Sequence, residues 1–554
     1  MFTPQWFYFM EKQHCLMFRF KDVLPLLFKV LIKMKMEHKL SVSSFKLSQI
    51  LLFLYFLFIQ TVTTEDVTHQ KSFTGEQVWR IQPATKQHIK YLRTLQKKYL
   101  DVLDFWTLPS SVNHNVDVRV PNHLQKKLKS SLKNKNLPYA TIIQDVQKLI
   151  EEERQSMVKD RKKRSVKSEN PSAEFNDFIL DSFVSHQEIN QWLTNISSQF
   201  EELCSTFDIG ETAEGRIIRV IKISLTNSTY KNQSKRAIWV EAGMHGREWI
   251  SPVTANNIIY NMITMSYSDR CVKNLLEAFD WYILPVANPD GYEYSRSRDR
   301  MWRKNRRLSE VLKRPWWSAY YSHSFQRNKY RYCYGVDLNR NFGFKWGVVG
   351  TSTNPCSEIY QGPAAFSEPE TAAIRDFASA VNNDTQIIVY LSLHSYGQMW
   401  LYSWGYTRQR SKDHKDLRYI ANQSSEAIFL ASQKRVQYTV GPAARTLYAS
   451  SGCSDDWAKG SLGVKYAFTL ELPPSDTDYQ LNGFLLPASA IPSIRETTWT
   501  GVKTMAELTL AAGRKQIGKK QNHLCRLCSH NSSAKSLEET SWNKSSCLSK
   551  QPKF

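Results

Sequence analysis

The sequence predicts an α/β protein in which a central mixed, mostly parallel sheet is flanked by helices and preceded by a small α+β domain. Two observations carry this prediction. Apolar runs typical of buried strands alternate with helical stretches between residues 165 and 515, as in sheets that helices cover. Shorter strand-like and helix-like segments alternate within residues 72–164, as in a small two-layer domain.

The chain begins with a segment that we interpret as a secretion signal. The apolar run 50–59, ILLFLYFLFI, is preceded by Lys46 and is too short for a transmembrane helix, which needs about 20 residues. It fits the apolar region of a signal peptide. Because a start at Met36 would give an ordinary signal sequence, we interpret residues 1–64 as a start-site extension plus the signal peptide. A membrane-anchoring segment is the alternative reading.

Cysteines and glycosylation triplets favour the same route. The chain has nine cysteines, some of which should pair in an oxidising compartment. It also has seven Asn-x-Ser/Thr triplets, which begin at Asn195, Asn227, Asn232, Asn383, Asn422, Asn531 and Asn543. These features and the signal predict a secreted, extracellular glycoprotein.

A net charge of +23 raises the question of a nucleic-acid partner. The basic residues are spread over 124–164, 298–331 and the tail beyond 513, without zinc-finger spacing or a basic heptad helix. We therefore expect no nucleic-acid partner. We also expect a monomer without a membrane anchor.

The sequence of residues 72–164 predicts three strands, two helices and a final charged helix. The strand candidates are 78–83, 116–121 and 139–145, and the helix candidates are 86–103, 124–132 and the stretch from Val146. The basic run 161–164 ends this domain. We interpret it as a processing site with cleavage after Arg164, although cations also suit the exposed end of a helix.

The large domain at 165–515 supplies the main sheet. Its strand candidates are 237–244, 281–289, 387–395 and 465–472, and helix candidates between them include 254–263 and 368–381. Sheets of this kind place functional sites at the carboxyl ends of their strands. The polar, basic tail at 516–554 is expected to be disordered.

Polar residues follow those strands in a pattern that suits a metal. His245 and Glu248 form a His-x-x-Glu pair after one strand, and His394 ends another. Catalytic zinc takes three protein ligands and leaves one position open. Each piece alone is weak evidence, since a single histidine there is more often a hydrogen-bonded core residue.

Further segments change that balance. In chain order they are Asn288–Tyr292, Met301–Lys304, Gly335–Asn341, Ser454–Trp457 and Thr469–Leu472. Together they resemble the zinc metallocarboxypeptidases of the pancreatic A/B type, most closely the B-type members, over about residues 72–510. The resemblance implies the carboxypeptidase fold, with a ferredoxin-like activation domain that acts as an intramolecular inhibitor until an endoprotease cleaves it.

The resemblance also implies the catalytic groups. The single Zn2+ ion would be bound by His245, Glu248 and His394. Glu471 would act as general base and acid on the attacking water, and Arg303 would stabilise the oxyanion. Asp337 would orient the first zinc histidine through its second ring nitrogen.

The remaining implied residues bind the peptide. Asn339 and Arg340 would hold the terminal carboxylate, for which an arginine fork is well shaped, and Tyr448 would close over the terminal residue. Arg247 and Tyr396 match positions that line subsites further from the terminus.

Asp455 lies seven residues after Tyr448, where the family lines the floor of the pocket for the terminal side chain. An aspartate there goes with a preference for Lys and Arg, because a cation relieves the cost of an unpaired buried carboxylate. The alternative is that Asp455 turns away or pairs with Arg445.

The cysteines and one segment differ from the family pattern. Cys333 and Cys356 match its disulfide, whereas Cys453 replaces a usual glycine, with Cys204 or Cys271 as conceivable partners. Residues 307–332 form a segment about twenty residues longer than usual. It is either a surface loop or a mis-spliced insertion.

We therefore predict a secreted zinc exopeptidase, made as a proenzyme, that releases C-terminal Lys or Arg from peptides and proteins. One alternative is an A-type preference for other terminal residues. Another is an inactive secreted homologue that only binds peptide C-termini, although the full set of zinc ligands and Glu471 argues against it.

Overall fold

The computed structural model describes residues 70–100, 102–165, 179–225, 235–313, 330–475 and 483–517. The predicted signal segment and the tail beyond 517 lie outside these residues. Among the helices that are described, none is both long and apolar enough to cross a membrane.

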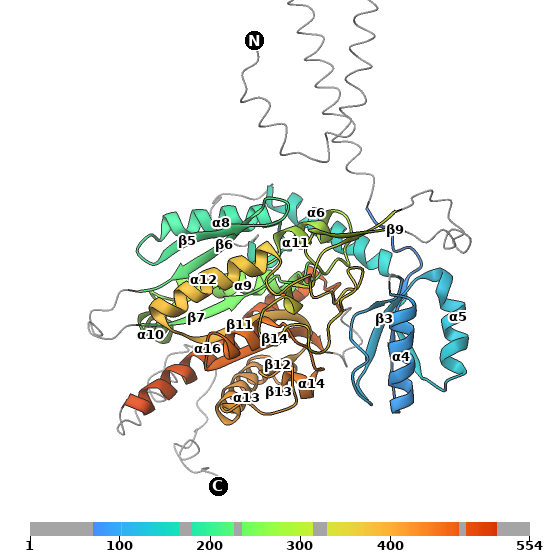
Figure 1. The fold of residues 1–554 in the computed structure, drawn as a ribbon. Helices are drawn as coiled ribbons and strands as arrows, with labels where there is room; N and C mark the ends of the chain where they lie inside the picture. The colour runs from blue at the N-terminus through green and yellow to red at the C-terminus, as the bar shows by residue number, and fades with distance from the viewer. Residues whose placement is uncertain are drawn as a thin grey trace, which may run out of the picture. The chain divides into compact units, whose positions relative to one another are not determined.

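The N-terminal domain is a four-stranded antiparallel sheet with two helices. The strands are β1 (Gln77–Ile81), β2 (Asp104–Phe105), β3 (Val116–Val120) and β4 (Tyr139–Ile143), in the order β2-β3-β1-β4. The helices are α4 (Lys86–Lys98) and α5 (Asn122–Lys133), and the longer α6 (Val146–Ser165) follows (Figure 1). Residue 164 is therefore in the last turn of α6.

Local sequence explains how these helices begin and pack. The Thr85 hydroxyl accepts a hydrogen bond from the His88 amide and caps α4. Ile89, Leu92 and Leu95 form the buried stripe of that helix, at the spacing of one helical face. The helix ends at Lys98, five residues earlier than the sequence predicts, and the chain then turns toward β2.

The catalytic-domain sheet has eight strands in the order β13-β12-β14-β11-β7-β8-β6-β5 (Figure 1). Their bounds are β5 (Cys204–Glu211), β6 (Ile217–Ile223), β7 (Arg236–Glu241), β8 (Phe279–Leu284), β11 (Ile387–Gly397), β12 (Met399–Tyr402), β13 (Thr439–Pro442) and β14 (Tyr466–Ser475). The pairs β7–β8, β7–β11, β11–β14 and β12–β13 are parallel and the other three are antiparallel. The predicted mixed, mostly parallel sheet is confirmed.

Helices cover both faces of this sheet, as the alternation along β7 requires. Ile238 and Val240 point into one core, whereas Ala237 and Trp239 point into the other. The first core contains side chains from α8 (His186–Gln199), α9 (Ile250–Thr264), α10 (Arg270–Ala278), α13 (His414–Ala431) and α16 (Ile491–Ile517). The second contains side chains from α12 (Pro369–Thr385) and α15 (Ser454–Gly460).

Shorter elements complete the domain. They are α11 (Pro289–Ser297), η2 (Leu338–Arg340), α14 (Ala443–Thr446), η3 (Ala488–Ala490) and the antiparallel pair β9 (Leu308–Lys313) and β10 (Tyr330–Tyr334). The long segment 307–332 thus begins and ends in a hairpin, and residues 314–329 lie outside the described part of the chain.

Two predicted strands end early, and both ends serve the site. β7 ends at Glu241 rather than at residue 244, and β8 ends at Leu284 rather than at 289, where Pro289 already begins α11. The chain leaves the sheet at these points to form the turns that carry polar side chains. Because β7, β11 and β14 run parallel, their carboxyl ends meet at one edge of the sheet.

The N-terminal domain packs against that edge. Trp106, Ile143 and Ile150 share a buried cluster with Met301, Tyr396 and Phe484 of the catalytic domain. The Trp106 ring contacts the edges of Tyr396 and Phe484 at centroid distances of 6.3 and 5.0 Å. This apolar contact anchors the N-terminal domain next to the residues described below.

Candidate active site

Three side chains converge at the sheet edge. The Nδ1 atoms of His245 and His394 lie 3.2 Å apart. Glu248 Oε1 lies 2.7 Å from Nδ1 of His245, and Glu248 Oε2 lies 3.0 Å from Nδ1 of His394. Potential ligand atoms of all three residues lie within 4.8 Å of one another, and the three side chains are buried. Two facing imidazole nitrogens with a carboxylate between them suit a cation, and this donor set is one that catalytic zinc uses.

The turn after β7 holds His245 and Glu248 in place. The Ser251 hydroxyl donates to the Glu248 carbonyl and accepts from the Gly243 amide, which fastens the turn to the start of α9. Gly246 has no room for a side chain, because a Cβ atom would lie 2.3 Å from the Gly291 carbonyl oxygen. Its amide donates to the Arg303 carbonyl, so the metal-binding turn and the arginine segment are directly joined.

Asp337 links the first histidine to Arg303. One Asp337 oxygen lies 3.1 Å from His245 Nε2, and the other accepts hydrogen bonds from Arg303 Nε and Nη2 at 3.2 and 3.0 Å. Burial alone would raise the pKa of Asp337, but Arg303 and Arg340 hold that pKa well below its usual range. The carboxylate is therefore charged and fixes the orientation of the His245 ring.

Asn339, Arg340 and Tyr448 lie together beside the metal-binding residues. Arg340 Nη2 lies 3.3 Å from the Tyr448 hydroxyl, and its Nη1 donates to the Asn339 carbonyl at 2.7 Å. The Asn339 amide nitrogen lies 3.3 Å from His394 Nε2. Their positions give one wall of a cavity a cationic fork and a phenol that face the same space.

Glu471 lies on the neighbouring strand. His394 and Glu471 are directly paired between β11 and β14, so both side chains are at the same height on the sheet. Burial raises the pKa of Glu471 to about 7, and this carboxylate lines the cavity with the metal-binding residues. A carboxyl group with this environment can take up and release a proton near neutral pH.

The cavity has a volume of about 80 Å³ and reaches from the metal-binding residues to Asp455. The Asp455 side chain is 3% exposed, and its Oδ2 atom has no hydrogen-bond partner among the described residues. Burial raises the pKa of this carboxyl group. The expected alternative partner, Arg445, instead donates to the Arg408 carbonyl at 2.8 Å. The neighbouring Asp456, by contrast, accepts hydrogen bonds from two backbone amides.

Arg247 and Tyr396 contact the N-terminal domain. Arg247 Nη1 donates to both oxygens of Asp104 at 3.0 and 3.1 Å, and the Tyr396 hydroxyl donates to Asp117 at 2.7 Å. Trp106 lines the cavity itself. Side chains of the N-terminal domain thus bind Arg247 and Tyr396, the two residues that are expected to contact the peptide further from its terminus.

Some residues of this interface were not found from the sequence. Glu153 on α6 forms a buried two-point ion pair with Arg300, with N–O distances of 2.7 and 3.0 Å, and Arg300 lies over the Trp249 ring at 3.6 Å. Asp104, Asp117 and Trp106 were missed as well. A charged residue in a helix or a strand carries no local signal that its partner lies more than a hundred residues away.

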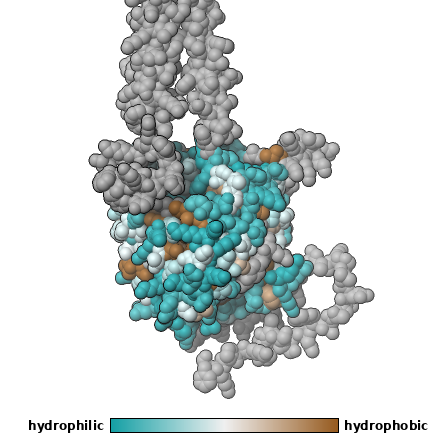
Figure 2. Space-filling model, turned by 90° about the vertical axis from the view of Figure 1, so that its right-hand side faces the viewer, coloured by the Kyte–Doolittle hydropathy of each residue, from teal (hydrophilic) through white to brown (hydrophobic). Residues whose placement is uncertain are grey.

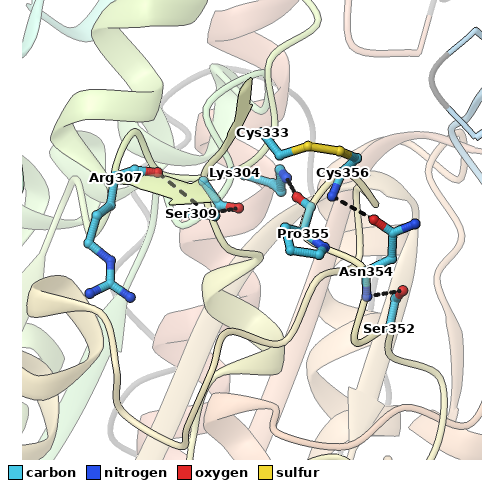
Figure 3. Close-up of a disulfide and its surroundings, with 9 residues drawn as sticks. Lys304, Arg307, Ser309, Cys333, Ser352, Asn354, Pro355 and Cys356 are labelled. Atoms are coloured by element: carbon cyan, nitrogen blue, oxygen red, sulfur yellow. Dashed lines mark hydrogen bonds between the residues drawn. A yellow bond between two sulfur atoms is a disulfide. The ribbon is translucent and has the colours of Figure 1, made fainter. Parts of the chain in front are cut away.

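The predicted Cys333–Cys356 disulfide is present. It joins β10 to the loop that contains Pro355, whose carbonyl accepts a hydrogen bond from Lys304 Nζ at 2.9 Å (Figure 3). The bridged loop therefore also holds the residue next to Arg303.

Neither conceivable partner of Cys453 pairs with it. Cys204 and Cys453 are both free and buried, and Cys271 is disulfide-bonded to neither. Cys453 lines the cavity, and burial raises the pKa of its thiol to about 12.

A mixed sheet with a His/Glu/His set at its carboxyl edge, flanked by a carboxylate and an arginine, defines a zinc hydrolase. Comparison with known proteins specifies the class. Residues 189–501 match the family model described as zinc carboxypeptidase, and residues 79–153 match the carboxypeptidase activation peptide. The chain belongs to the zinc carboxypeptidase family and is a metallocarboxypeptidase made with its activation peptide, with one catalytic Zn2+.

Individual relatives support the same family assignment. Carboxypeptidase A5 of Macaca fascicularis is 35% identical over 80% of this chain and 92% of its own length. Carboxypeptidase B of Astacus astacus is 38% identical over 59% of this chain and 96% of its own length. Among solved structures, the thrombin activatable fibrinolysis inhibitor superposes with a TM-score of 0.65 at 30% identity, over 79% of this chain and all of that one.

Proposed function

We propose that the protein is a secreted carboxypeptidase that releases C-terminal Lys and Arg from peptides and proteins. One observation carries this substrate preference, namely the buried Asp455 oxygen that has no partner among the described residues and lies at the cavity. An ammonium or guanidinium group of a substrate would supply that partner and offset the cost of burying the carboxylate.

Recognition of the chain end falls to Arg340. Its guanidinium is buried beside Asn339 and Tyr448, and a guanidinium fork binds a carboxylate through two parallel hydrogen bonds. A peptide bond inside a chain offers no carboxylate, so this contact restricts cleavage to the last residue. In this proposal Tyr448, which lines the same cavity, covers the bound residue and excludes water.

His245, Glu248 and His394 would hold the zinc ion, which would supply a Lewis acid that polarises the scissile carbonyl and lowers the pKa of a bound water to about 7. Glu471 accepts a proton from that water and returns it to the leaving amine. Arg303 lines the same cavity and donates to the oxygen that gains negative charge. Loss of one such donor typically costs on the order of 3 kcal/mol of transition-state stabilisation.

The N-terminal domain inhibits the enzyme by occupying the path of the peptide. Asp104 holds Arg247, Asp117 holds Tyr396, and Trp106 stands in the cavity. We infer that an endoprotease cleaves after Arg164 and that the signal segment at 50–59 directs secretion. Cleavage in the last turn of α6 leaves the contacts of Asp104 and Asp117 intact, so domain release is a separate step.

An A-type preference is the second candidate, because several relatives, including the one from Macaca fascicularis, are named carboxypeptidase A. A direct test uses the proenzyme after limited proteolysis and compares kcat/KM for hippuryl-Arg, hippuryl-Lys and hippuryl-Phe. We expect the basic substrates to be preferred by at least about 100-fold, the effect of roughly 3 kcal/mol. Rapid hydrolysis of hippuryl-Phe with none of hippuryl-Arg would establish the A-type alternative.

A further inference from the structure

A wide groove lies away from the active site. It is a groove of about 700 Å³ between α4, the loop 110–112 and Arg408 of the catalytic domain. Ten residues line it, among them Lys86, Lys90, Arg93, Lys97 and Arg408. Half of them carry a positive charge, and none carries a negative charge.

Four of these cations form one stripe along α4. Lys86, Lys90, Arg93 and Lys97 are spaced by four, three and four residues, which places them on the same face of the helix. The stripe is about 16 Å long at 1.5 Å per residue. All four side chains are exposed, and α4 has no acidic residue. In the described part of the chain, none of the four forms an ion pair with a carboxylate.

The loop wall of the groove is fixed rather than loose. Arg93 donates from Nε to the Pro109 carbonyl at 3.0 Å and from Nη2 to the Ser110 carbonyl at 3.2 Å. These bonds hold the loop beside the stripe and place two serine hydroxyls in the groove.

The catalytic domain continues the positive charge on the other wall. Arg445 donates to the Arg408 carbonyl at 2.8 Å, which places the two arginines together. Arg410 and Arg418 are also exposed nearby. Burial and then these two arginines lower the pKa of His414. The stripe on α4 and Arg408 of the catalytic domain therefore line one groove together.

Such a surface is complementary to a polyanion. The groove has no aromatic lining residue on which bases could stack, and none of the large exposed apolar side chains lies in it to enter a membrane surface. The face of the molecule shown in Figure 2 is mostly hydrophilic. Sulfate groups are bound by lysine charges and arginine forks without either feature.

We propose that this groove binds a linear sulfated polysaccharide, and that the bound chain holds the activation domain on the catalytic domain by contacting α4 and Arg408 together. The choice of an extracellular polysaccharide rests on the secretion inferred above. A ligand that binds only the docked arrangement stabilises it in proportion to its affinity. Release of the activation domain after cleavage is then slower wherever the polysaccharide is abundant.

The binding test uses the full proenzyme and size-defined heparin oligosaccharides at several salt concentrations. We expect binding at 0.15 M salt that weakens steeply as salt rises, since each neutralised cation releases about one counterion. Changing Lys86, Lys90, Arg93 and Lys97 together to Gln should lower the slope of log Kd against log salt by about three to four. The matched control changes four exposed lysines on or next to α5 to Gln, namely Lys126, Lys127, Lys133 and Lys135, and should bind heparin almost as the unchanged proenzyme does.

The retention test follows activation. After limited proteolysis, activity toward a small substrate should appear more slowly with heparin than without it, and Arg408→Gln should reduce this delay. Equal loss of binding in the α5 control, no delay with heparin, or tighter binding to single-stranded DNA or phosphatidylserine vesicles than to heparin would overturn the proposal. The final activity and substrate preference without heparin report on the proposed function independently, because the groove variants leave the active site unchanged.

Discussion

The role of Asp455 can be tested by a change that removes its charge and keeps its shape. Asp455→Asn replaces one carboxylate oxygen by an amide group at the cavity, where the Oδ2 atom has no partner among the described residues. The backbone of α15 and the volume of the pocket stay the same. The change therefore isolates the electrostatic contribution to binding of the terminal side chain.

The size of the effect follows from burial. Asp455 is 3% exposed, so a lysine or arginine side chain that reaches it forms a largely desolvated charge pair. Truncating one partner of such a pair costs about 2 to 5 kcal/mol. Taking about 3 kcal/mol, kcat/KM for hippuryl-Arg should fall on the order of 100-fold. Hippuryl-Phe should be hydrolysed roughly tenfold faster, because its ring no longer faces an unpaired carboxylate, a penalty of about 1 to 3 kcal/mol.

The assay measures kcat/KM for both substrates after proteolytic activation, and its readout is their ratio. Asp456→Asn is the matched control, since it makes the same carboxyl-to-amide change one residue away, where backbone amides of Gly405 and Tyr406 already bind the carboxyl group. The control should keep the ratio within about threefold. If Asp455→Asn also keeps the ratio within about threefold, Asp455 does not select the substrate and the reasoning is refuted.

Three further predictions concern the metal, the activation domain and stability. Treatment with 1,10-phenanthroline should remove one Zn2+ per chain, measured by mass spectrometry, and abolish hydrolysis, and added Zn2+ should restore both; activity that persists in zinc-free protein would contradict this. Asp104→Asn should raise the activity of the uncleaved proenzyme several-fold, because it breaks the charge pair with Arg247; unchanged activity would show that Trp106 suffices to block the site. Burial raises the pKa of Glu370 to about 8, so between pH 5 and 8 this group is protonated when folded and ionised when unfolded. As the pH rises through this range, Glu370 should lower the free energy of unfolding by about 1.4 kcal/mol per pH unit. Denaturant unfolding at several pH values should show this contribution in the unchanged protein and not in Glu370→Gln. Equal slopes in both proteins would refute the prediction.

The fold and the candidate metal site were largely predictable because their signals are local. Apolar runs identified β7, β8, β11 and β14. Of the expected metal ligands, His245 and Glu248 lie in the turn after β7, and His394 lies in β11. The ends of β7 and β8 were not predictable from apolarity, because Ala242 to Met244 and Val286 are buried outside the sheet and carry the same signal as a strand.

The contacts between domains could not be predicted in the same way. Asp117 belongs to a strand whose residues are all buried. A carboxylate in such a strand departs from the apolar pattern that predicts burial. Its partners Arg80 and Tyr396 lie 37 and 279 residues away. Which pairs form depends on how the two domains dock, and residue periodicity reports only burial within an element. For the same reason the sequence could not show that Cys453 stays a free thiol.

The names of the relatives and the pocket of this chain point to different terminal residues. Identity to relatives named carboxypeptidase A is an average over about 440 aligned residues. Terminal-residue preference depends on the few side chains at the end of one small cavity. A buried carboxylate oxygen without a partner destabilises a folded protein by about 1 to 3 kcal/mol, and Asp456 next to it shows that this segment can satisfy such a group. A cationic terminal side chain would supply the partner that Asp455 lacks, and on this ground we propose Lys and Arg as the terminal residues although several relatives are named carboxypeptidase A.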